Sequence, residues 1–520
     1  MKKLSIGVID LVAKGPNNSL WARIMYANLA SIMPQVVATW CEEEGHEVKM
    51  ICYTGREDLK KELPHDVDIV FISSFTHAAF LAYSLSNYFR TQGVVTVLGG
   101  PHARCYPEDS VKYFDYVMGF TDKSTIIDVL KDCTPQRPEG KQVSATRQPH
   151  SLPGVRERWK FIEPTLAKAP FIKMVPMIGS MGCPYTCSFC IDSVVPYQLL
   201  DLKTIRDDLR FLLTKFKKPL VGWHDPNFGV KFDDNMEAIA SAAPPKSFRF
   251  IGESSLSILT EEHLKVLEKN GFTAVLPGIE SWFELGNKSK SSHITGEEKV
   301  NRISEHVNMM FRYVSYVQTN FVLGLDSDTG KEPFELTKRF IDKSPGALPG
   351  YSLLTAFGEA APLNLEYQKA GRVLPFPFHF LNNHLAMNLK PKNYEWVDFY
   401  DKVIDLTEYT FSRKAIYRRL MATPGFVPKW MNFMRAISSE GSGRIRFYRR
   451  LRQQLISDRA FRQYFEGETN QLPAFYMNII KKDLGVWWQW LPQGAIEHDP
   501  NAYLEKKRKQ NSELKLSTVN

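Results

Sequence analysis

The stretch MGCPYTCSFC, residues 181–190, places Cys183, Cys187 and Cys190 within one short segment. Thiolates favour soft metals such as zinc, Cu(I) and the iron of iron–sulfur clusters. A structural zinc ion usually takes four ligands, and no second Cys pair or Cys/His pair lies nearby at zinc-finger spacing. A 4Fe–4S cluster held by three cysteines would instead leave one iron open to a substrate or a cofactor.

The region around these cysteines, residues 171–357, alternates β-rich runs with amphipathic helices. Such a series predicts an open, partial (β/α)6 barrel of the TIM type, whose active face lies at the carboxyl ends of the strands. Because the cysteines follow the first strand directly, we expect them in a loop at that face. The predicted strands are 173–180, 220–223, 248–252, 273–279, 316–324 and 351–357.

The N-terminal region, residues 1–135, also alternates strand and helix signals, which predicts a Rossmann-like, doubly wound parallel sheet. Ligands of such sheets bind at the carboxyl ends of the strands. Small residues occur at those ends and would let the backbone approach a large ligand. They are Ser73, Ser74, Gly99, Gly100 and Gly119.

The remaining segments differ in composition. Residues 136–170 are rich in Pro, Gly, Gln and Ser, which predicts a linker. Residues 358–520 have a mostly helical pattern and a polar tail. The fold class is therefore α/β, with a Rossmann-like domain, a partial barrel and a helical C-terminal region.

Charge and cysteine usage bear on the cellular compartment and on the kinds of partner to expect. The chain of 520 residues has an odd number of cysteines, seven, and four of them are scattered, so a reducing cytoplasm is expected. No run reaches the ~18 apolar residues of a membrane span. A net charge of +9 is modest for this length and implies no nucleic-acid partner by itself.

With the cysteine spacing and the barrel together, the sequence resembles the radical S-adenosylmethionine (SAM) superfamily. Phe189, directly before the last cysteine, supplies the aromatic residue that this family usually has there. The resemblance implies that SAM chelates the open iron, that an electron from an external donor cleaves its C–S bond, and that the resulting adenosyl radical abstracts a hydrogen atom.

Other barrel positions resemble SAM-binding positions of the family less closely. The resemblance implies SAM contacts at Asp225 after the second strand, Glu253 at the third, Gly278 and Glu280 in GIES, and Gly324 in FVLGLDSDTG. The usual Gly-Gly-Glu is absent, and Asp225 is the nearest acidic residue. For each position the alternative is a strand-end side chain that makes a local hydrogen bond or caps a helix.

The N-terminal region resembles the cobalamin-binding domain of one branch of this superfamily. The resemblance is carried by GHEVKM, DVDIVFISS, VVTVLGGPHARCYPED and FDYVMG, and it implies that the five small strand-end residues bind cobalamin. The chain departs from the branch at 119–122 and at 33–37. A Rossmann-like domain that only packs on the barrel or binds substrate is the alternative, and His102 is expected to be structural rather than a cobalt ligand.

The C-terminal region carries a basic cluster and an aromatic cluster. They would suit a membrane surface, an anionic substrate or RNA, but a solvated helix face with buried aromatics is the favoured interpretation. In the resembled branch this region caps the barrel, and lipid-like and tetrapyrrole substrates are common. The clusters are Arg418, Arg419, Arg444, Arg446, Arg449, Arg450 and Arg452, and Trp487, Trp488 and Trp490.

The sequence therefore predicts a cobalamin-dependent radical SAM enzyme, a methyltransferase acting on an unactivated carbon of a small molecule. A radical SAM enzyme that closes or rearranges rings is the first alternative. A non-catalytic sensor or carrier is the second, although it would not need an open iron. No nucleic-acid partner is expected, a peripheral membrane contact stays open, and the sequence does not name the substrate or the oligomeric state.

Overall fold

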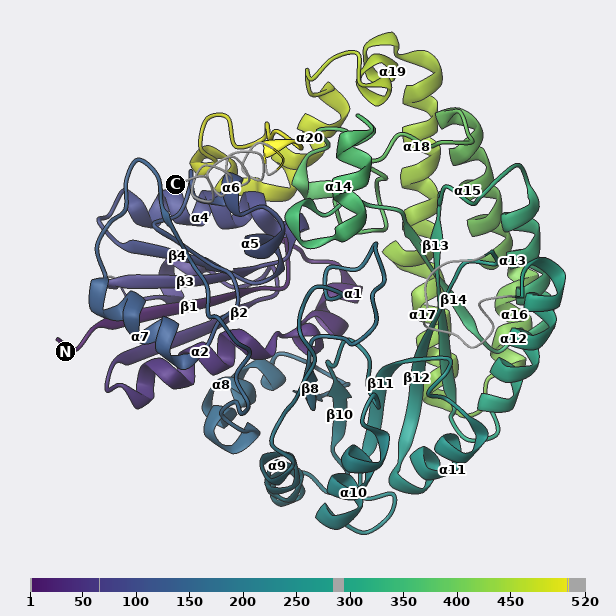
Figure 1. Ribbon diagram of the computed structural model, residues 1–520, viewed down its shortest axis with the longest axis horizontal. Helices are drawn as coiled ribbons and strands as arrows, with labels where there is room; N and C mark the ends of the chain where they lie inside the picture. The colour runs from purple at the N-terminus through teal and green to yellow at the C-terminus, as the bar shows by residue number, and fades with distance from the viewer. Residues whose placement is uncertain (1, 65, 284–293, 503, 505–520) are drawn as a thin grey trace, which may run out of the picture.

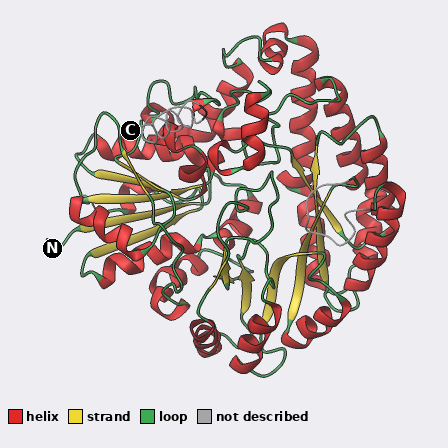
Figure 2. Cartoon of the chain, in the orientation of Figure 1, coloured by secondary structure: helices red, strands yellow, loops and turns green. Residues whose placement is uncertain are grey.

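Two parallel, six-stranded sheets form the framework of the protein. The computed structural model describes residues 2–64, 66–283, 294–502 and 504. Figure 2 shows the strands in two separate groups with helices outside both, and Figure 1 shows the C-terminal helices running along the barrel and back toward the N-terminal sheet. The prediction of an α/β fold with a TIM-like sheet and a helical C-terminal region is confirmed.

The N-terminal sheet has the strand order β2-β1-β3-β4-β5-β6, and all its pairings are parallel. The order reverses between β1 and β3, so the switch point at which doubly wound sheets bind ligands lies at the carboxyl ends of these two strands. The strands are β1 (Ser5–Leu11), β2 (Glu47–Tyr53), β3 (Ile69–Ser74), β4 (Val95–Gly99), β5 (Tyr116–Met118) and β6 (Lys141–Val143). The β-rich runs 4–9, 48–52, 68–72, 94–98 and 115–119 agree with β1 to β5 to within two residues, whereas β6 was not predicted.

Helices cover both faces of this sheet, which is why its central strands are apolar throughout. Ile6 and Val8 of β1 belong to a core with α2 and α7, whereas Ile9 and Leu11 belong to a larger core that includes α4. The helices of this region are α1 (Leu20–Met25), η1 (Tyr26–Leu29), α2 (Ile32–Glu43), α3 (Leu59–Glu62), η2 (Thr76–Ala78), α4 (Ala79–Arg90), α5 (Pro101–Cys105), α6 (Pro107–Ser110) and α7 (Lys123–Asp132).

The second sheet has the order β14-β13-β12-β11-β10-β7, so β7 and β14 are the free edges of an open barrel. A short antiparallel pair, β8 with β9, follows the first strand and frames the cysteine loop. The strands are β7 (Met174–Met177), β8 (Ser180–Met181), β9 (Gln198–Leu199), β10 (Leu220–Trp223), β11 (Arg249–Ser255), β12 (Phe272–Glu280), β13 (Tyr316–Leu323) and β14 (Leu348–Leu353).

Amphipathic helices cover the outer face of the barrel sheet. Asp201 caps the first of them by accepting hydrogen bonds from the N–H groups of Lys203 and Thr204, and Leu209 and Leu212 lie on its buried side. The helices are α9 (Leu202–Lys215), α10 (Phe232–Ala242), α11 (Glu261–Asn270), α12 (Gly296–Met310) and α13 (Glu332–Lys343).

The segment 136–170, predicted as a linker, carries regular structure. Lys141–Val143 form β6 at the edge of the N-terminal sheet, and Val155–Ala167 form helix α8. Phe161, Ile162 and Leu166 of this helix are buried, because its apolar side packs between the two sheets. The segment therefore belongs to the packed structure, while the exact division of the chain at 135, 170 and 357 stays a prediction.

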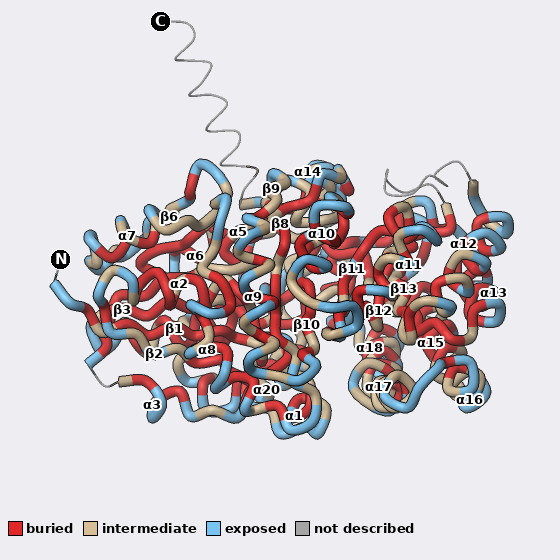
Figure 3. The backbone as a smooth tube through the Cα atoms, turned by 90° about the horizontal axis from the view of Figure 1, so that it is seen from below, coloured by how far each residue is buried: buried red, intermediate tan, exposed pale blue. Residues whose placement is uncertain are grey.

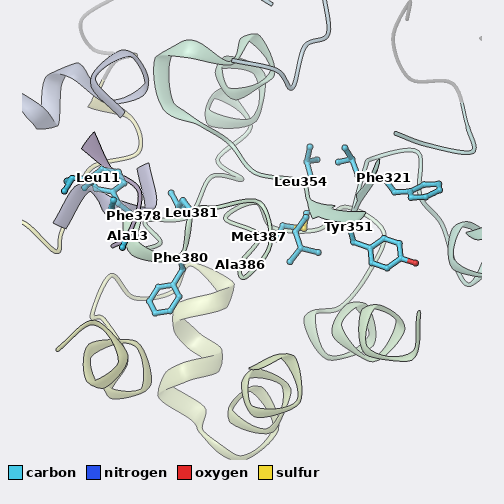
Figure 4. Close-up of a cluster of buried hydrophobic side chains, with 14 of the residues drawn as sticks. Leu11, Ala13, Phe321, Tyr351, Leu354, Phe378, Phe380, Leu381, Ala386 and Met387 are labelled. Atoms are coloured by element: carbon cyan, nitrogen blue, oxygen red, sulfur yellow. The ribbon is translucent and has the colours of Figure 1, made fainter. Parts of the chain in front are cut away.

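One segment, residues 376–389, connects the cores of the two sheets, and we call it the bridging segment. Figure 4 shows Phe378, Phe380 and Leu381 next to Leu11 and Ala13, and Met387 on the side of Leu354 and Tyr351. The large core accordingly runs without interruption from the N-terminal sheet through the barrel to the C-terminal helices. Figure 3 shows this buried interior along the length of the molecule.

The C-terminal region is helical, as predicted. None of the helices in the described part of the chain is long and apolar enough to cross a membrane. The elements are η3 (Gly358–Ala360), α14 (Pro362–Lys369), η4 (Phe378–Phe380), α15 (Trp396–Thr410), α16 (Arg413–Ala422), α17 (Phe426–Ile437), the π-helical η5 (Ser439–Gly443), α18 (Arg444–Ser457), α19 (Arg459–Glu466), α20 (Ala474–Leu484) and η6 (Gly485–Trp490).

Many side chains of the basic and aromatic clusters in this region form ion pairs, hydrogen bonds or packing contacts within the protein. Arg449 and Arg452 form ion pairs with Glu408 and Asp401, and Arg444 donates to the carbonyl of Tyr351. Trp487 is buried and meets Tyr88 edge to face at 5.7 Å. These contacts support the interpretation as a solvated helix face with buried aromatics.

Candidate functional site

The cysteine loop connects β8 to β9 and is closed at its base. Ser180 pairs with Leu199 and Met181 with Gln198, so both ends of the loop are fixed in one small ladder. The N–H of Cys183 donates to the carbonyl of Val195 at 3.4 Å. Gly182 is required here, since a side chain would collide with the carbonyl of Pro196.

Two of the three cysteines are buried in this loop. Cys183 and Cys187 are 7% and 3% exposed, and Cys190 is half-buried. All seven cysteines lie in the described part of the chain, and none forms a disulfide. In the described residues no three His, Cys, Asp or Glu side chains already stand in a metal-binding arrangement, so the three thiols share one loop without being gathered around one point. Three thiols on a loop fixed at both ends are nevertheless a donor set that fits an iron–sulfur cluster.

Asp225 holds the start of the cysteine loop. Its carboxylate accepts hydrogen bonds from the N–H of Gly179 at 2.9 Å and from the hydroxyl of Ser180 at 2.6 Å. The side chain is buried, and burial raises the pKa of Asp225 to about 6, against the opposing effect of these hydrogen bonds. Asp225 therefore positions the loop, and its predicted contact with SAM stays a prediction.

The other side of the loop is held by the N-terminal sheet and the C-terminal region. Arg104 of α5, two residues after the GGPH stretch, pairs with Asp192 at 3.2 Å, two residues beyond Cys190. The N–H of Leu363 donates to the carbonyl of Ser188 at 2.8 Å. The carboxyl ends of both sheets thus meet at the cysteine loop near the middle of Figure 1.

Arg104 and Asp192 were not predicted as site residues. Each looks like an ordinary polar loop or helix residue, because the ion pair joins positions far apart in the chain. The only available signal was the place of Arg104, which follows the glycine-rich end of a predicted strand.

The inner face of the barrel is polar, whereas its outer face is packed. Phe321 of β13 faces outward, 5.4 Å from the ring of Trp282, in the helix-covered core. Its neighbour Asn320 faces the other way and accepts a hydrogen bond from Gln318 at 2.7 Å. Glu253 on β11 is exposed. Gln318 and Asn320 were not predicted as site residues, although the polar–apolar alternation of YVQTNFVLG contained the signal.

Gly278 and Glu280 form one unit at the end of β12. Glu280 has a positive φ of 65°, which is uncommon for a residue with a side chain and marks local strain. A side chain at Gly278 would collide with the carboxylate of Glu280, so the carboxylate folds back over the glycine. Burial lowers the pKa of the nearby Lys299, and the charge of Glu280 opposes this shift. The backbone strain at Glu280 makes this strand end a candidate for a ligand contact.

Gly324, at the end of β13, has a φ of 87° and lies in a packed environment. A side chain here would approach the Met387 sulfur to 2.8 Å and the Phe399 ring to 3.1 Å. The N–H groups of Gly324 and Leu325 donate to the carboxylate of Asp328 at 3.0 and 3.1 Å. The backbone is therefore fixed firmly, while its approach to adenine stays a prediction.

The small residues predicted to bind cobalamin lie along the carboxyl edge of the N-terminal sheet. Ser73 pairs in register with Gly99, and both are half-buried. A Cβ added at Gly99 would have no atom within 4 Å, so the edge is open there. Ser74 and Gly100 are packed against each other, and Ser144 closes the space beside Gly119. An open edge of small residues fits a large planar cofactor at Ser73 and Gly99.

His102 lies apart from this open edge, in an aromatic cluster. Its Nε2 is 2.7 Å from the hydroxyl of Tyr83, which in turn donates to Asp109 at 2.8 Å. The ring packs against Phe378 of the bridging segment at 4.8 Å. The side chain is fully buried, and burial lowers the pKa of His102 to about 3. The structure thus gives His102 a structural role.

A three-cysteine loop after the first strand of an open, six-stranded barrel, facing the edge of a Rossmann-like sheet, defines the radical SAM class of fold. The chain shares its fold with the radical SAM methyltransferase TsrM of Kitasatospora setae. A TsrM structure with tryptophan and a SAM analogue bound covers 72% of this chain and 78% of TsrM, with a TM-score of 0.52 and 15% identity. A second, with cobalamin and a [4Fe-4S] cluster, covers 71% and 75% with the same TM-score.

Two curated proteins are similar to the chain in sequence, and both come from Chlorobaculum tepidum. The bacteriochlorophyllide d C-8(2)-methyltransferase is 26% identical over 378 residues, or 69% of this chain and 81% of that protein. The C-12(1)-methyltransferase is 22% identical over 376 residues, or 71% and 80%. No protein-family model matches the chain. These comparisons confirm the resemblance to the cobalamin-binding branch of radical SAM enzymes that the sequence motifs indicated.

Proposed function

We propose that this chain is a cobalamin-dependent radical SAM methyltransferase that adds a methyl group to an unactivated carbon of a small molecule. The observation that carries the proposal is the Arg104–Asp192 ion pair, which brings the open edge of the N-terminal sheet to the cysteine loop. The curated relatives support methyl transfer over ring closure, over rearrangement and over a sensor or carrier role.

Each cofactor has candidate residues in this chain. Cys183, Cys187 and Cys190 would hold the cluster, with Phe189 beside them. SAM would lie on the inner face near Glu253, Gly278, Glu280 and Gly324, and cobalamin along the edge at Ser73, Ser74, Gly99, Gly100 and Gly119. When bound, the cluster would supply the electron that cleaves SAM, and cobalamin would carry the methyl group, with an external donor providing electrons.

The chain itself contributes position and shielding. Asp225, Arg104 and the backbone of Leu363 fix the cysteine loop from three sides, which limits the movement of any group bound there. Burial of Cys183 and Cys187 keeps their thiols away from bulk water. The polar inner face offers hydrogen-bonding groups to the polar parts of SAM and of a substrate.

For the substrate we favour a tetrapyrrole over a lipid-like molecule. The support is that both relatives are named for methyl transfer to bacteriochlorophyllide d and that each alignment covers about four-fifths of the relative. An open barrel also leaves its inner face accessible, because β7 and β14 do not pair.

The proposal is tested on protein purified and reconstituted without oxygen, with iron, sulfide and corrinoid measured before turnover. Addition of SAM and a reductant should yield 5′-deoxyadenosine, and a methyl-labelled SAM should label a chlorophyllide-type tetrapyrrole. Cys187→Ala should lose nearly all cluster iron and SAM cleavage. Cys133→Ala, a half-buried cysteine of the N-terminal region, is the matched control and should keep both.

The outcomes separate the parts of the proposal. Unchanged iron content in Cys187→Ala would contradict the ligand assignment. SAM cleavage without retained corrinoid would replace methyl transfer through cobalamin by other radical chemistry. Retained corrinoid with no SAM cleavage would favour the carrier role.

A further inference from the structure

Helices α16 and α17 form a helical hairpin, residues 413–437, whose outward surface is apolar. We call it the α16–α17 hairpin. It holds almost half of the exposed large hydrophobic side chains among the described residues, which is unusual for a surface in water. They are Tyr417 (64% exposed), Met421 (59%), Phe426 (80%), Val427 (53%), Phe433 (44%) and Ile437 (51%).

The spacing of these residues shows that α17 has two different sides. Phe426, Phe433 and Ile437, with half-buried Trp430, follow one another at intervals of three or four residues, so they share one side of the helix. Asn432 and Ala436 are buried on the opposite side. The apolar stripe that a helix normally turns inward is therefore directed outward here.

The charge of the hairpin is exclusively positive. Between Glu408 and Glu440 the sequence has no Asp or Glu and six basic residues. Arg418 pairs with Asp342, Arg435 pairs with Glu440, and Arg419 donates to backbone carbonyls. In the described part of the chain Arg413, Lys414 and Lys429 have no carboxylate within ion-pair distance.

We propose that the α16–α17 hairpin docks the protein onto an anionic lipid surface. Exposed aromatic and aliphatic side chains next to unpaired Lys and Arg are the combination that lies in a membrane interface, with rings among the acyl chains and charges at the headgroups. A second copy of this chain fits less well, because a two-fold contact would bring the like-charged faces of two hairpins together. Of the basic residues seen in the sequence at 444–452, Arg449 and Arg452 are already paired with Glu408 and Asp401.

The hairpin is in direct contact with the barrel sheet. Arg435 extends from α17 to the inner face, where it donates to the hydroxyl of Tyr316 at 2.8 Å and to Gln318. In Figure 3, α16 and α17 lie along the same edge of the molecule as α1, which carries exposed Leu20 (60%). A lipid-bound orientation would therefore place the barrel next to the membrane, where an apolar substrate is concentrated. The docking itself is independent of the proposed chemistry.

The test is co-sedimentation of the full chain with vesicles of phosphatidylcholine alone or mixed with phosphatidylglycerol. Wild-type protein should bind the mixed vesicles and lose binding as salt is raised. Phe426→Asp and the pair Arg413→Glu/Lys414→Glu should each weaken binding by about tenfold or more. Circular dichroism of each variant should match the wild type, because the changed side chains are exposed.

Matched controls distinguish this surface from general stickiness. Phe171→Asp alters a side chain that is 75% exposed elsewhere, and Lys217→Glu/Lys218→Glu alters two adjacent exposed lysines. Both controls should bind like the wild type. Equal binding of Phe426→Asp and wild type overturns the proposal, as does equal binding to both vesicle types. A dimer in sedimentation velocity that Phe426→Asp dissociates would assign the surface to a second copy instead.

Discussion

The two sheets of this protein have the same number of strands, all parallel, yet they present very different surfaces to a ligand. The N-terminal sheet is covered by helices on both faces, and His102 beyond the end of β4 is packed in an aromatic cluster with Phe378 of the bridging segment. The barrel sheet is covered on its outer face, and its inner face keeps polar residues such as Glu253 and Asn320. The surface that a parallel sheet offers to a ligand thus depends on which helices, loops and side chains cover its faces and its strand ends.

The largest expected effect concerns the junction between the sheets. A side chain at Gly358 would collide with the carbonyl of Cys105 in α5, and Gly358 has a φ of 50°. Gly358→Ala should therefore lower the free energy of unfolding by about 2–4 kcal/mol, through backbone strain and displacement of α5. Thermal unfolding monitored by tryptophan fluorescence measures this change.

Gly99→Ala is the matched change on the open edge of the N-terminal sheet. A Cβ there has no atom within 4 Å, so stability should change by less than about 0.5 kcal/mol. Corrinoid retention should fall in this variant, because the added methyl group would project from the edge proposed to bind cobalamin. If Gly99→Ala unfolds as early as Gly358→Ala, the contrast between a packed junction and an open edge is wrong.

The next effect compares two buried carboxylates at the strand ends. Asp225 holds the cysteine loop through Gly179 and Ser180, whereas Asp10 at the end of β1 accepts the N–H of Ser31 at 2.7 Å, away from the loop. Residues that orient metal ligands usually affect metal affinity by about 10–100-fold. Asp225→Ala should therefore release cluster iron to a chelator about 10–100-fold more readily than the wild type.

Asp10→Ala is the control for the loss of a buried carboxylate as such. It should lower stability without changing iron retention once measured below its unfolding temperature. Asp225→Asn should restore much of the retention, because its amide can accept from Gly179 and donate to Ser180. Equal iron loss in both alanine variants would remove Asp225 as the specific anchor.

The sequence predicted the strands well because buried parallel strands carry continuous apolar runs between polar breaks. The cysteine loop could be predicted equally well, since the spacing of its three cysteines is a local pattern. The long-range pairs could not be predicted, because Arg104 and Asp192, or Arg435 and Gln318, meet only after the whole chain has folded. No local pattern distinguishes a residue that will find such a partner from an ordinary surface residue.

The bridging segment shows the same limit for apolar residues. PFPFHF at 375–380 looks like a proline-rich connection, yet Phe378 and Phe380 complete the core of the N-terminal sheet. The basic and aromatic runs near the C-terminus show the opposite case, because the sequence alone made them look like possible binding surfaces. Many of these residues form ion pairs or are packed inside the protein. The apolar surface of the α16–α17 hairpin, in contrast, could be recognised only from the burial of its residues.

The smallest expected effect is on the pH dependence of stability, to which one buried carboxyl near each sheet contributes. Burial raises the pKa of Asp10 to about 6 and that of Asp328, beside Gly324 in the barrel, to about 7. A carboxyl whose pKa is higher in the folded state stabilises the fold below its unfolded pKa of about 3.9, and this stabilisation disappears as pH rises through the folded value. The contribution of these two carboxyls to stability should therefore fall from pH 4 to pH 7.

The contributions of the two carboxyls to this fall can be separated between pH 6 and pH 7. Asp328 should account there for about 1 kcal/mol of lost stability and Asp10 for only about 0.3 kcal/mol, because most of the Asp10 effect is complete by pH 6. Asn keeps an acceptor for the N–H groups of Gly324 and Leu325 but does not titrate, so Asp328→Asn should flatten the profile in this window while Asp10→Asn should leave it nearly unchanged. The measurement is the thermal midpoint of the wild type, Asp328→Asn and Asp10→Asn as a function of pH, in matched buffers at constant ionic strength. Parallel curves for the three proteins would contradict the expected difference between the two carboxyls.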